Sequence, residues 1–257
     1  MMFPMIASLR SKDSSTPREL DWACHPGASM AGDKNADLMR HGWPLLLTVL
    51  LICLALPSAA GAVCAPEKMV RIVTRDVSPG VAAEPFREQP KTLYRLGTRY
   101  GRVEELPNPA SGLHLLVVIN EPDVWMVNRR DGTGRHSIDP GPTFHVRAPV
   151  FERPGLPATL ADLEHGCERA YFSGPNVKSS GTAGVGGRRC DLRTVDAATF
   201  RVTLCLDPGT RTPRRVSLYE RDAVLAVLEY DAYEDALPAD LSLFARPRGV
   251  KFSEPAR

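Results

Sequence analysis

The stretch "TFRVTLCLDPGTRTPRRVSLYERDAVLAVLEYDAYED" at residues 199–235 gives the clearest structural signal in the chain. Runs of alternating apolar and polar residues follow one another here, with short turn-forming segments between them. Such alternation is typical of strands with one buried face, and short connections favour antiparallel pairing. Together with the preceding run "RRCDLRTV" (188–195), the stretch predicts an antiparallel β-meander.

The alternation also assigns side chains to faces of the predicted sheet. Residues 199–207 place four apolar side chains on one face: Phe200, Val202, Leu204 and Leu206. Cys205 falls on the other face, whereas Cys190 shares a face with Leu192. If both leucine faces meet the core, the two cysteines point to opposite sides of the sheet. This disfavours a Cys190–Cys205 disulfide unless a bulge shifts the register.

Residues 216–252, "VSLYERDAVLAVLEYDAYEDALPADLSLFARPRGVKF", resemble the end of the outer-membrane lipoprotein carrier proteins and their periplasmic relatives. In that family a Y-x-x-Y pair and an LF-x-x-P-x-G-V segment follow two long antiparallel strands. The matching residues are Tyr230, Tyr233, Leu243, Phe244, Pro247, Gly249 and Val250. Residues 202–220 are similar to the family's strand, D-P-x-T-x-x-P turn and strand, with matches at Asp207, Pro208, Thr210 and Pro213. "DVWMVNRRDGTGRH" (123–136) looks like its middle hairpin.

The resemblance covers about residues 68–252 and implies a mainly β (α+β) fold. It implies a half-open antiparallel β-barrel, or curved sheet, with one or two helices over the concave face. It also implies that a lipid or acyl chain binds on that face. The carriers usually begin with an amphipathic helix, but the corresponding region here is short and Pro-rich. We therefore expect a reduced helical lid.

The rest of the chain reads mostly as strands, with one helix and one loop. Strands are predicted at 70–73, 92–106, 113–120 and 123–128, and Asp131-Gly132 predicts a hairpin turn. Residues 137–146 predict a short strand, a Pro/Gly bend and another strand. Residues 156–172 form the best helix candidate, with Thr159 as its N-cap and Gly166 as an early end. The Gly-rich stretch 179–187 predicts a flexible loop, because no phosphate-loop context surrounds it.

A hydrophobic run, "WPLLLTVLLICLALPSAAGA", occupies residues 43–62. A short basic segment precedes it, and small residues at Ala60 and Ala62 end it, in the order of a secretory signal peptide. Its core is shorter than the ~20 residues of a transmembrane helix. We expect a mis-annotated or disordered extension at 1–38, a signal peptide at 39–62 cut after Ala62, and a single domain at 63–257 with no transmembrane segment. An uncleaved anchor and a lipoprotein cut before Cys64 are the alternatives.

Four cysteines remain after this cut: Cys64, Cys167, Cys190 and Cys205. An even count in an exported chain predicts two disulfides, with three alternative pairings. One disulfide together with a free thiol is the alternative. A zinc site would need closely spaced pairs such as C-x-x-C, which these cysteines do not form. The protein is therefore predicted to be periplasmic or secreted.

Composition and motifs argue against several classes of function. The net charge of +2 is too small to predict a nucleic-acid partner. The histidines are scattered, and no G-x-S-x-G elbow or nucleophile–base pair is apparent, so we expect no enzyme, metal or cofactor.

The strand at 123–128 is apolar on both faces: Trp125 and Val127 point one way, Val124 and Met126 the other. One face of such a strand packs in a core, and the other lines a pocket or lies under a helix; the alternative is a fully covered central strand. The predicted ligand-binding residues are Trp125, Val127, Phe144, Val202 and Leu204.

The sequence thus predicts an exported non-enzymatic protein that binds a lipid or acyl chain on a concave β-sheet. The alternative is an envelope structural or interaction protein with a filled barrel, a protein partner and no small ligand.

Overall fold

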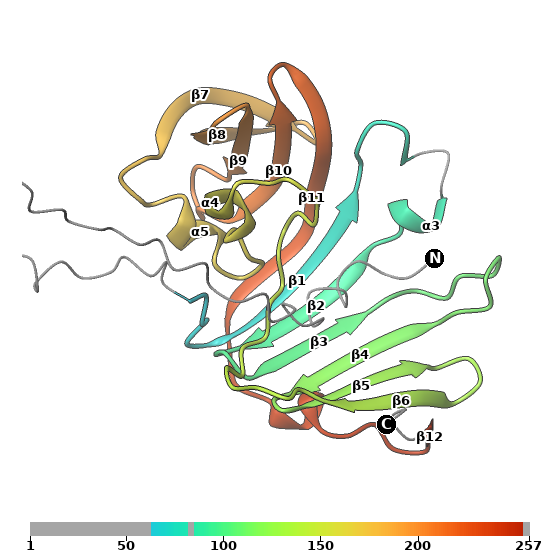
Figure 1. Cartoon of the computed structure of the whole chain (residues 1–257). Coiled ribbons are helices and arrows are strands. Elements are labelled where there is room, and N and C mark those ends of the chain that lie inside the picture. The colour runs from blue at the N-terminus through green and yellow to red at the C-terminus, as the bar shows by residue number, and fades with distance from the viewer. Residues whose placement is uncertain (1–62, 82–84, 254–257) are drawn as a thin grey trace, which may run out of the picture. The chain divides into compact units, whose positions relative to one another are not determined.

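The computed structural model describes residues 63–81 and 85–253 (Figure 1). The predicted extension at 1–38 and signal peptide at 39–62 lie outside the described residues. Among the described residues, no helix is both long enough and apolar enough to span a membrane.

Strands dominate the fold and form one sheet (Figure 1). They are β1 (Met69–Asp76), β2 (Lys91–Leu96), β3 (Tyr100–Glu104), β4 (Leu115–Asn120), β5 (Asp123–Asn128), β6 (Thr133–Ile138), β7 (Lys178–Val185), β8 (Arg188–Ala197), β9 (Phe200–Leu206), β10 (Pro213–Glu220), β11 (Ala223–Leu237) and β12 (Lys251–Ser253). Their order is β12-β6-β5-β4-β3-β2-β1-β11-β10-β9-β8-β7. Two antiparallel meanders therefore join where β1 pairs with β11. The prediction of a curved, open and mainly antiparallel sheet is confirmed, with the addition that β12 pairs with β6 in parallel.

The helices are shorter than the sequence predicts. The described chain has α3 (Pro85–Glu88), α4 (Ala158–Ala161), α5 (Glu168–Tyr171) and the 3₁₀-helix η2 (Leu241–Phe244). Gly166 adopts a φ of +91° between α4 and α5, so the candidate at 156–172 is divided. A Cβ at Gly166 would also lie 3.0 Å from Val70 Cγ2. Thr159 lies inside α4, whose N-cap is Pro157, so the predicted cap was wrong.

Two local predictions in loops and strands were also wrong. The expected flexible loop at 179–187 lies mostly in β7, which pairs with β8 at the edge of the sheet. Hydrogen bonds between the backbones of β7 and β8 explain this difference. Such pairing forms even where the small side chains of a strand bury little surface. The second strand expected within 137–146 is absent from the described chain, and only the end of β6 falls there.

Cys190 and Cys205 form a disulfide, with their Cα atoms 5.5 Å apart. The expectation that they point to opposite sides was wrong because its premise about Leu192 was wrong. Leu192 pairs with Cys205, while Val195 pairs with the fully buried Val202. Val195 therefore marks the core face of β8, and Leu192, Cys190 and Cys205 share the other face.

The turn at Asp207 confirms the structural role of the D-P-x-T segment. Asp207 Oδ1 accepts hydrogen bonds from the backbone N–H groups of Gly209 and Thr210, both at 3.0 Å. Arg214 donates to the other oxygen at 2.9 Å. These contacts, led by the Thr210 N–H, lower the pKa of Asp207 below its usual range. The aspartate thus stabilises the β9–β10 connection.

Two clusters of buried side chains lie on opposite faces of the sheet. The larger one lies on the concave face, where Leu160 of α4, Leu163 after α4 and Phe172 at the C-cap of α5 pack against the strands on either side of the β1–β11 junction. The smaller one lies on the outer face of β4 and β5 and contains Leu116, Val118, Trp125 and Val127. The expectation of helices over the concave face is confirmed for α4 and α5 (Figure 1).

Candidate functional site

A cavity of about 360 Å³ lies on the concave face of the sheet. Its floor consists of apolar side chains of four consecutive strands: Leu93 of β2, Val103 of β3, Leu115, Val117 and Ile119 of β4, and Val124 of β5. Leu218 of β10 and Leu225 and Leu228 of β11 line another side. Because residues on one face of a sheet alternate along each strand, the register brings these side chains together.

Residues 146–153, which we term the crossing segment, line the cavity opposite the strands. Val146 N–H donates to Thr98 O at 2.8 Å, and Val150 N–H donates to Leu163 O at 2.9 Å. The segment is therefore fixed to the β2–β3 turn and to the end of the α4 region. Figure 1 shows the chain passing from β6 across the sheet to α4.

Gly101 on β3 allows this close approach. A Cβ at Gly101 would lie 2.8 Å from Val146 Cγ1 and 3.5 Å from Ile119 Cδ1. Real Cβ atoms essentially never approach a neighbour so closely, so a side chain here would displace the crossing segment.

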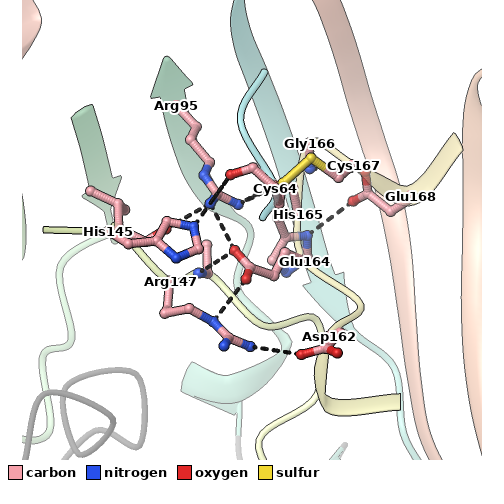
Figure 2. A network of polar contacts seen from close by, with 12 residues as sticks. Cys64, Arg95, His145, Arg147, Asp162, Glu164, His165, Gly166, Cys167 and Glu168 are labelled. Atoms are coloured by element: carbon pink, nitrogen blue, oxygen red, sulfur yellow. Dashed lines mark hydrogen bonds and ion pairs between the residues drawn. A yellow bond between two sulfur atoms is a disulfide. The ribbon is translucent and has the colours of Figure 1, made fainter. Parts of the chain in front are cut away.

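A buried polar network anchors the crossing segment, and Figure 2 shows its central residues, among them Arg95, Glu164 and Glu168. At its centre the fully buried Arg95 on β2 donates to Val146 O at 2.6 Å, to Cys64 O at 3.0 Å and to His165 O at 3.1 Å. Burial lowers the pKa of Arg95, while the nearby Glu164 carboxylate acts in the opposite direction. One side chain thus holds three segments that are distant in sequence.

Glu164 supplies the counter-charge for Arg95. Its Oε2 lies 2.7 Å from Arg95 Nη2, and its Oε1 lies 2.8 Å from Arg147 Nε (Figure 2). Ala148 N–H also donates to Glu164 Oε2, at 3.3 Å. A buried ion pair needs such additional hydrogen bonds to offset the cost of removing both charges from water.

Glu168 forms the second half of the network. It accepts hydrogen bonds from Tyr230 OH at 3.0 Å, from Tyr233 OH at 2.8 Å and from Gly166 N–H at 2.9 Å. Desolvation and the Glu168 charge raise the pKa of both tyrosines well above the usual value, so both hydroxyls remain donors. The Y-x-x-Y pair found in the sequence therefore ties α5 to β11.

The Cys64–Cys167 disulfide adds a covalent link to the same region. It joins the residues before β1 to the beginning of α5, and Arg95 Nη1 lies 3.1 Å from Cys64 Sγ. Together with the Cys190–Cys205 bond, it resolves the choice among three pairings that the sequence left open. The predicted two-disulfide framework is confirmed.

Polar side chains gather at the end of the cavity formed by the end of β1, α3 and the beginning of β2. Asp76 pairs with Arg87 at 2.9 Å, and Glu105 pairs with Lys91 at 3.0 Å. Gln89 lines this end as well, and Glu152 lines the cavity from the crossing segment. Burial raises the pKa of Glu152. The cavity thus combines a long apolar floor with a polar end.

The five ligand-binding residues predicted from the sequence lie outside the lining of this cavity. Trp125 and Val127 belong to the cluster on the outer face, where Val250 and Phe252 cover them. Val202 and Leu204 are fully buried in the larger cluster, and Phe144 is 44% exposed beside Gly141. Ligand binding at these five residues stays a prediction, and the proposal below uses other residues.

The residues that line the cavity were missed, although the sequence contained a signal for them. Val124 faces away from Trp125 on β5, and the same alternation selects Val117 and Ile119 on β4. Arg95 and Glu164 carried no such signal, because their pairing depends on the packing of segments far apart in sequence. Among the described residues, no group of three or more His, Cys, Asp or Glu side chains could hold a metal ion.

No family model matches the chain, and no curated protein matches it in sequence. Among solved structures, an uncharacterized conserved protein from Thermus thermophilus is 15% identical, with a TM-score of 0.43 over 74% of this chain and 91% of that chain. MucB, solved in complex with MucA(peri), is 11% identical, with a TM-score of 0.33 over 72% of this chain and 56% of that chain.

A putative outer membrane lipoprotein-sorting protein domain from Vibrio parahaemolyticus is also similar to the chain. It is 10% identical, with a TM-score of 0.32 over 69% of this chain and 89% of that chain. The sequence indicated a resemblance to lipoprotein carrier proteins, and this domain is one of the solved structures to which the chain is similar. Because the identities and TM-scores are low, the proposals below rest on the residues of this chain.

Proposed function

We propose that the chain is an exported, non-enzymatic protein that binds a hydrophobic ligand, a lipid or an acyl chain, in the cavity beneath the crossing segment. The observation that carries this proposal is the apolar floor of Leu93, Val103, Val117 and Val124 within a cavity of about 360 Å³. Sites for small molecules occupy roughly 300–1,000 Å³ and are mostly apolar with a few polar groups.

The size of the cavity favours a single chain as ligand. Its volume of about 360 Å³ lies near the lower limit of ligand sites. Each methylene group buried there contributes about 0.8 kcal/mol to binding, so one acyl chain supplies enough apolar surface to offset the cost of association. Space for several chains would require the crossing segment to move.

Export is supported by the cysteines and by the predicted signal peptide. Disulfides persist in oxidising compartments and are rare in the cytosol. The Cys64–Cys167 and Cys190–Cys205 bonds are therefore consistent with a periplasmic or secreted protein. The proposal that the chain is not an enzyme rests on the cavity itself, whose lining is largely apolar and whose basic side chains Arg87, Lys91 and Arg147 are each paired with a carboxylate.

Gentle native mass spectrometry tests this proposal. The chain would be expressed from Met39 with its own leader segment and purified from the periplasm without detergent. We expect a lipid-sized mass in addition to the polypeptide, lost on collisional activation, and a polypeptide mass that corresponds to two disulfides. A bare polypeptide that also fails to take up added dodecanol would contradict the proposal. That outcome would favour an envelope interaction protein, to be sought by cross-linking to envelope partners.

A further inference from the structure

Three side chains that line the cavity each have a buried oxygen without a hydrogen-bond partner among the described residues: Gln89 Oε1, Glu105 Oε2 and Glu152 Oε1. Buried polar atoms in folded proteins are almost always paired, so each exception requires an explanation. The three are all acceptors, and all line the same cavity. A ligand group that donates hydrogen bonds would satisfy them.

Glu105 carries the strongest part of this argument. Its side chain is only 4% exposed, and Lys91 Nζ contacts one carboxylate oxygen, Oε1, at 3.0 Å. The other oxygen, Oε2, is buried and has no described partner. Glu105 follows β3 and Lys91 begins β2, and these strands pair with each other, so Gln89 lies at the same end of the cavity. A buried carboxylate oxygen without a partner is stabilised most by a hydrogen bond from a charged donor.

The charges around the cavity favour a cationic donor. Four basic side chains of the lining are already matched: Arg87 with Asp76, Lys91 with Glu105, Arg102 with Glu104, and Arg147 with Glu164. Within the described part of the chain, Glu152 forms no ion pair, and its carboxylate oxygen Oε1 is buried. Arg153, the next residue, is exposed. A positive ligand group would offset the cost of keeping Glu152 ionised.

We propose that the polar end of this cavity is a subsite for the primary ammonium headgroup of a single-chain amphiphile, with Glu105, Gln89 and Glu152 as acceptors. An ammonium group carries a positive charge and three N–H donors and has no acceptor. Its donors match the three unpaired acceptors in number, and its charge complements the two carboxylates, Glu105 and Glu152. This inference rests on the proposed function, because the apolar chain of the amphiphile must occupy the floor of the cavity.

Displacement of a neutral fluorescent probe, N-phenylnaphthylamine, by dodecyl compounds tests the headgroup directly. Dodecylamine, dodecyltrimethylammonium, dodecanol and dodecanoate share one chain and differ in their headgroups. We expect dodecylamine to displace the probe at about one-tenth of the concentration that the trimethylammonium compound needs, since the latter has the charge but no N–H donor.

Two isosteric variants locate the effect. Glu105→Gln and Glu152→Gln should each reduce the preference for dodecylamine about tenfold or abolish it, and leave dodecanol binding unchanged. Glu220→Gln, on an exposed residue at the end of β10, removes the same charge outside the cavity and should leave the preference intact. Thermal melting confirms that each variant folds. Because Glu105→Gln and Glu152→Gln change different residues, each variant tests the subsite separately.

The outcomes separate the headgroup from the proposed function. Equal binding of all four compounds, or tightest binding of dodecanoate, would overturn the ammonium subsite and leave the hydrophobic site standing. Loss of the amine preference in Glu220→Gln as well would also overturn it, since the effect would then be one of net charge. If neither the probe nor any dodecyl compound binds, the proposed function itself fails.

Discussion

The two faces of β4 and β5 have the same chemistry but different surroundings. On the outer face, Trp125 and Val127 lie under the C-terminal residues Val250 and Phe252. On the concave face, Val117 and Val124 line a cavity of about 360 Å³. The two faces differ in how they are covered. The C-terminal residues pack directly against the outer face, whereas the crossing segment passes over the concave face and leaves a cavity beneath it. An apolar strand face therefore leaves a cavity only where the covering segment is held away from it.

What holds the crossing segment away is the polar network around Arg95 and the Cys64–Cys167 disulfide. The disulfide closes a long loop, with a sequence separation of 103 residues, whereas the Cys190–Cys205 bond has a separation of 15. The first bond lies beside the concave face and the second on the outer face of β8 and β9. The two disulfides therefore allow the two faces to be perturbed separately.

The largest expected effect comes from removing the Cys64–Cys167 bond. Substituting both cysteines with serine should reduce the free energy of unfolding by about 4–5 kcal/mol, because the bond restricts a long loop in the unfolded chain. The variant should also lose affinity for the hydrophobic probe, since the crossing segment loses its anchor. Denaturant unfolding and probe titration measure the two effects.

The Cys190→Ser, Cys205→Ser variant is the matched control for that prediction. Its shorter loop should cost about 3 kcal/mol, with probe affinity unchanged. Equal losses of probe affinity in both variants would show that the Cys64–Cys167 bond has no special relation to the cavity.

The next effect concerns the covered outer face. Trp125→Ala should reduce stability by about 3–5 kcal/mol, because it leaves a void beneath Val250 and Phe252. The folded protein should still bind the hydrophobic probe with its original affinity, measured well below the melting temperature. A large loss of affinity would instead make Trp125 a ligand contact, as the sequence alone predicted.

A substitution on the concave face should change probe affinity more than stability, the reverse of the outer face. Val117→Phe adds volume to the floor of the cavity, so stability should change by less than about 1.5 kcal/mol, since open space accommodates the larger side chain. Probe affinity should fall about tenfold as the apolar space is filled. Ile138→Phe, at an exposed position on β6, is the control and should change neither quantity. Unchanged affinity in Val117→Phe would place the ligand elsewhere.

The smallest expected effect lies at the turn between β4 and β5, where both faces end. Desolvation, reinforced by Asp139, raises the pKa of the buried Glu121 from 4.5 to about 7. The folded state therefore binds a proton more tightly than the unfolded chain, so stability should fall as the pH rises from 4.5 to about 7. Glu121→Gln should flatten this slope and raise the Tm above pH 7 by a few degrees, at about 2–4 °C per kcal/mol.

A wild-type Tm that rises between those two pH values would contradict the assignment, as would an unchanged slope in the variant. Asp123→Asn is a suitable control, because Asp123 lies in the same hairpin but is partly exposed and contacts His136.

The same comparison explains how far the sequence could predict the fold. Strands β4, β5, β9, β10 and β11 were visible because each alternates apolar and polar side chains or is continuously apolar. Strand β7 was not, because its small side chains bury little and its ladder depends on β8. The face of Cys190 was misassigned because Leu192 is an apolar residue on the outer face.

The candidate site was harder to predict than the fold. Alternation showed that β5 has two apolar faces but could not show which one a segment fills. That outcome depends on Gly101, whose missing side chain admits Val146, and on Arg95, whose partners Cys64 and Glu164 are remote in sequence. Such contacts arise from tertiary packing, and periodicity carries no information about them.

Photolabelling with a diazirine-bearing fatty alcohol, whose headgroup carries no charge, tests the difference between the two faces most directly. After irradiation, fragment-ion mass spectrometry would locate the attached chain to single residues along β4 and β5, where the two faces alternate residue by residue. We predict labels on Val117, Ile119 and Val124, which line the cavity, and on Phe151 of the crossing segment. Labels concentrated on Leu116, Val118 and Trp125 of the outer face would contradict the assignment of the concave face as the binding site.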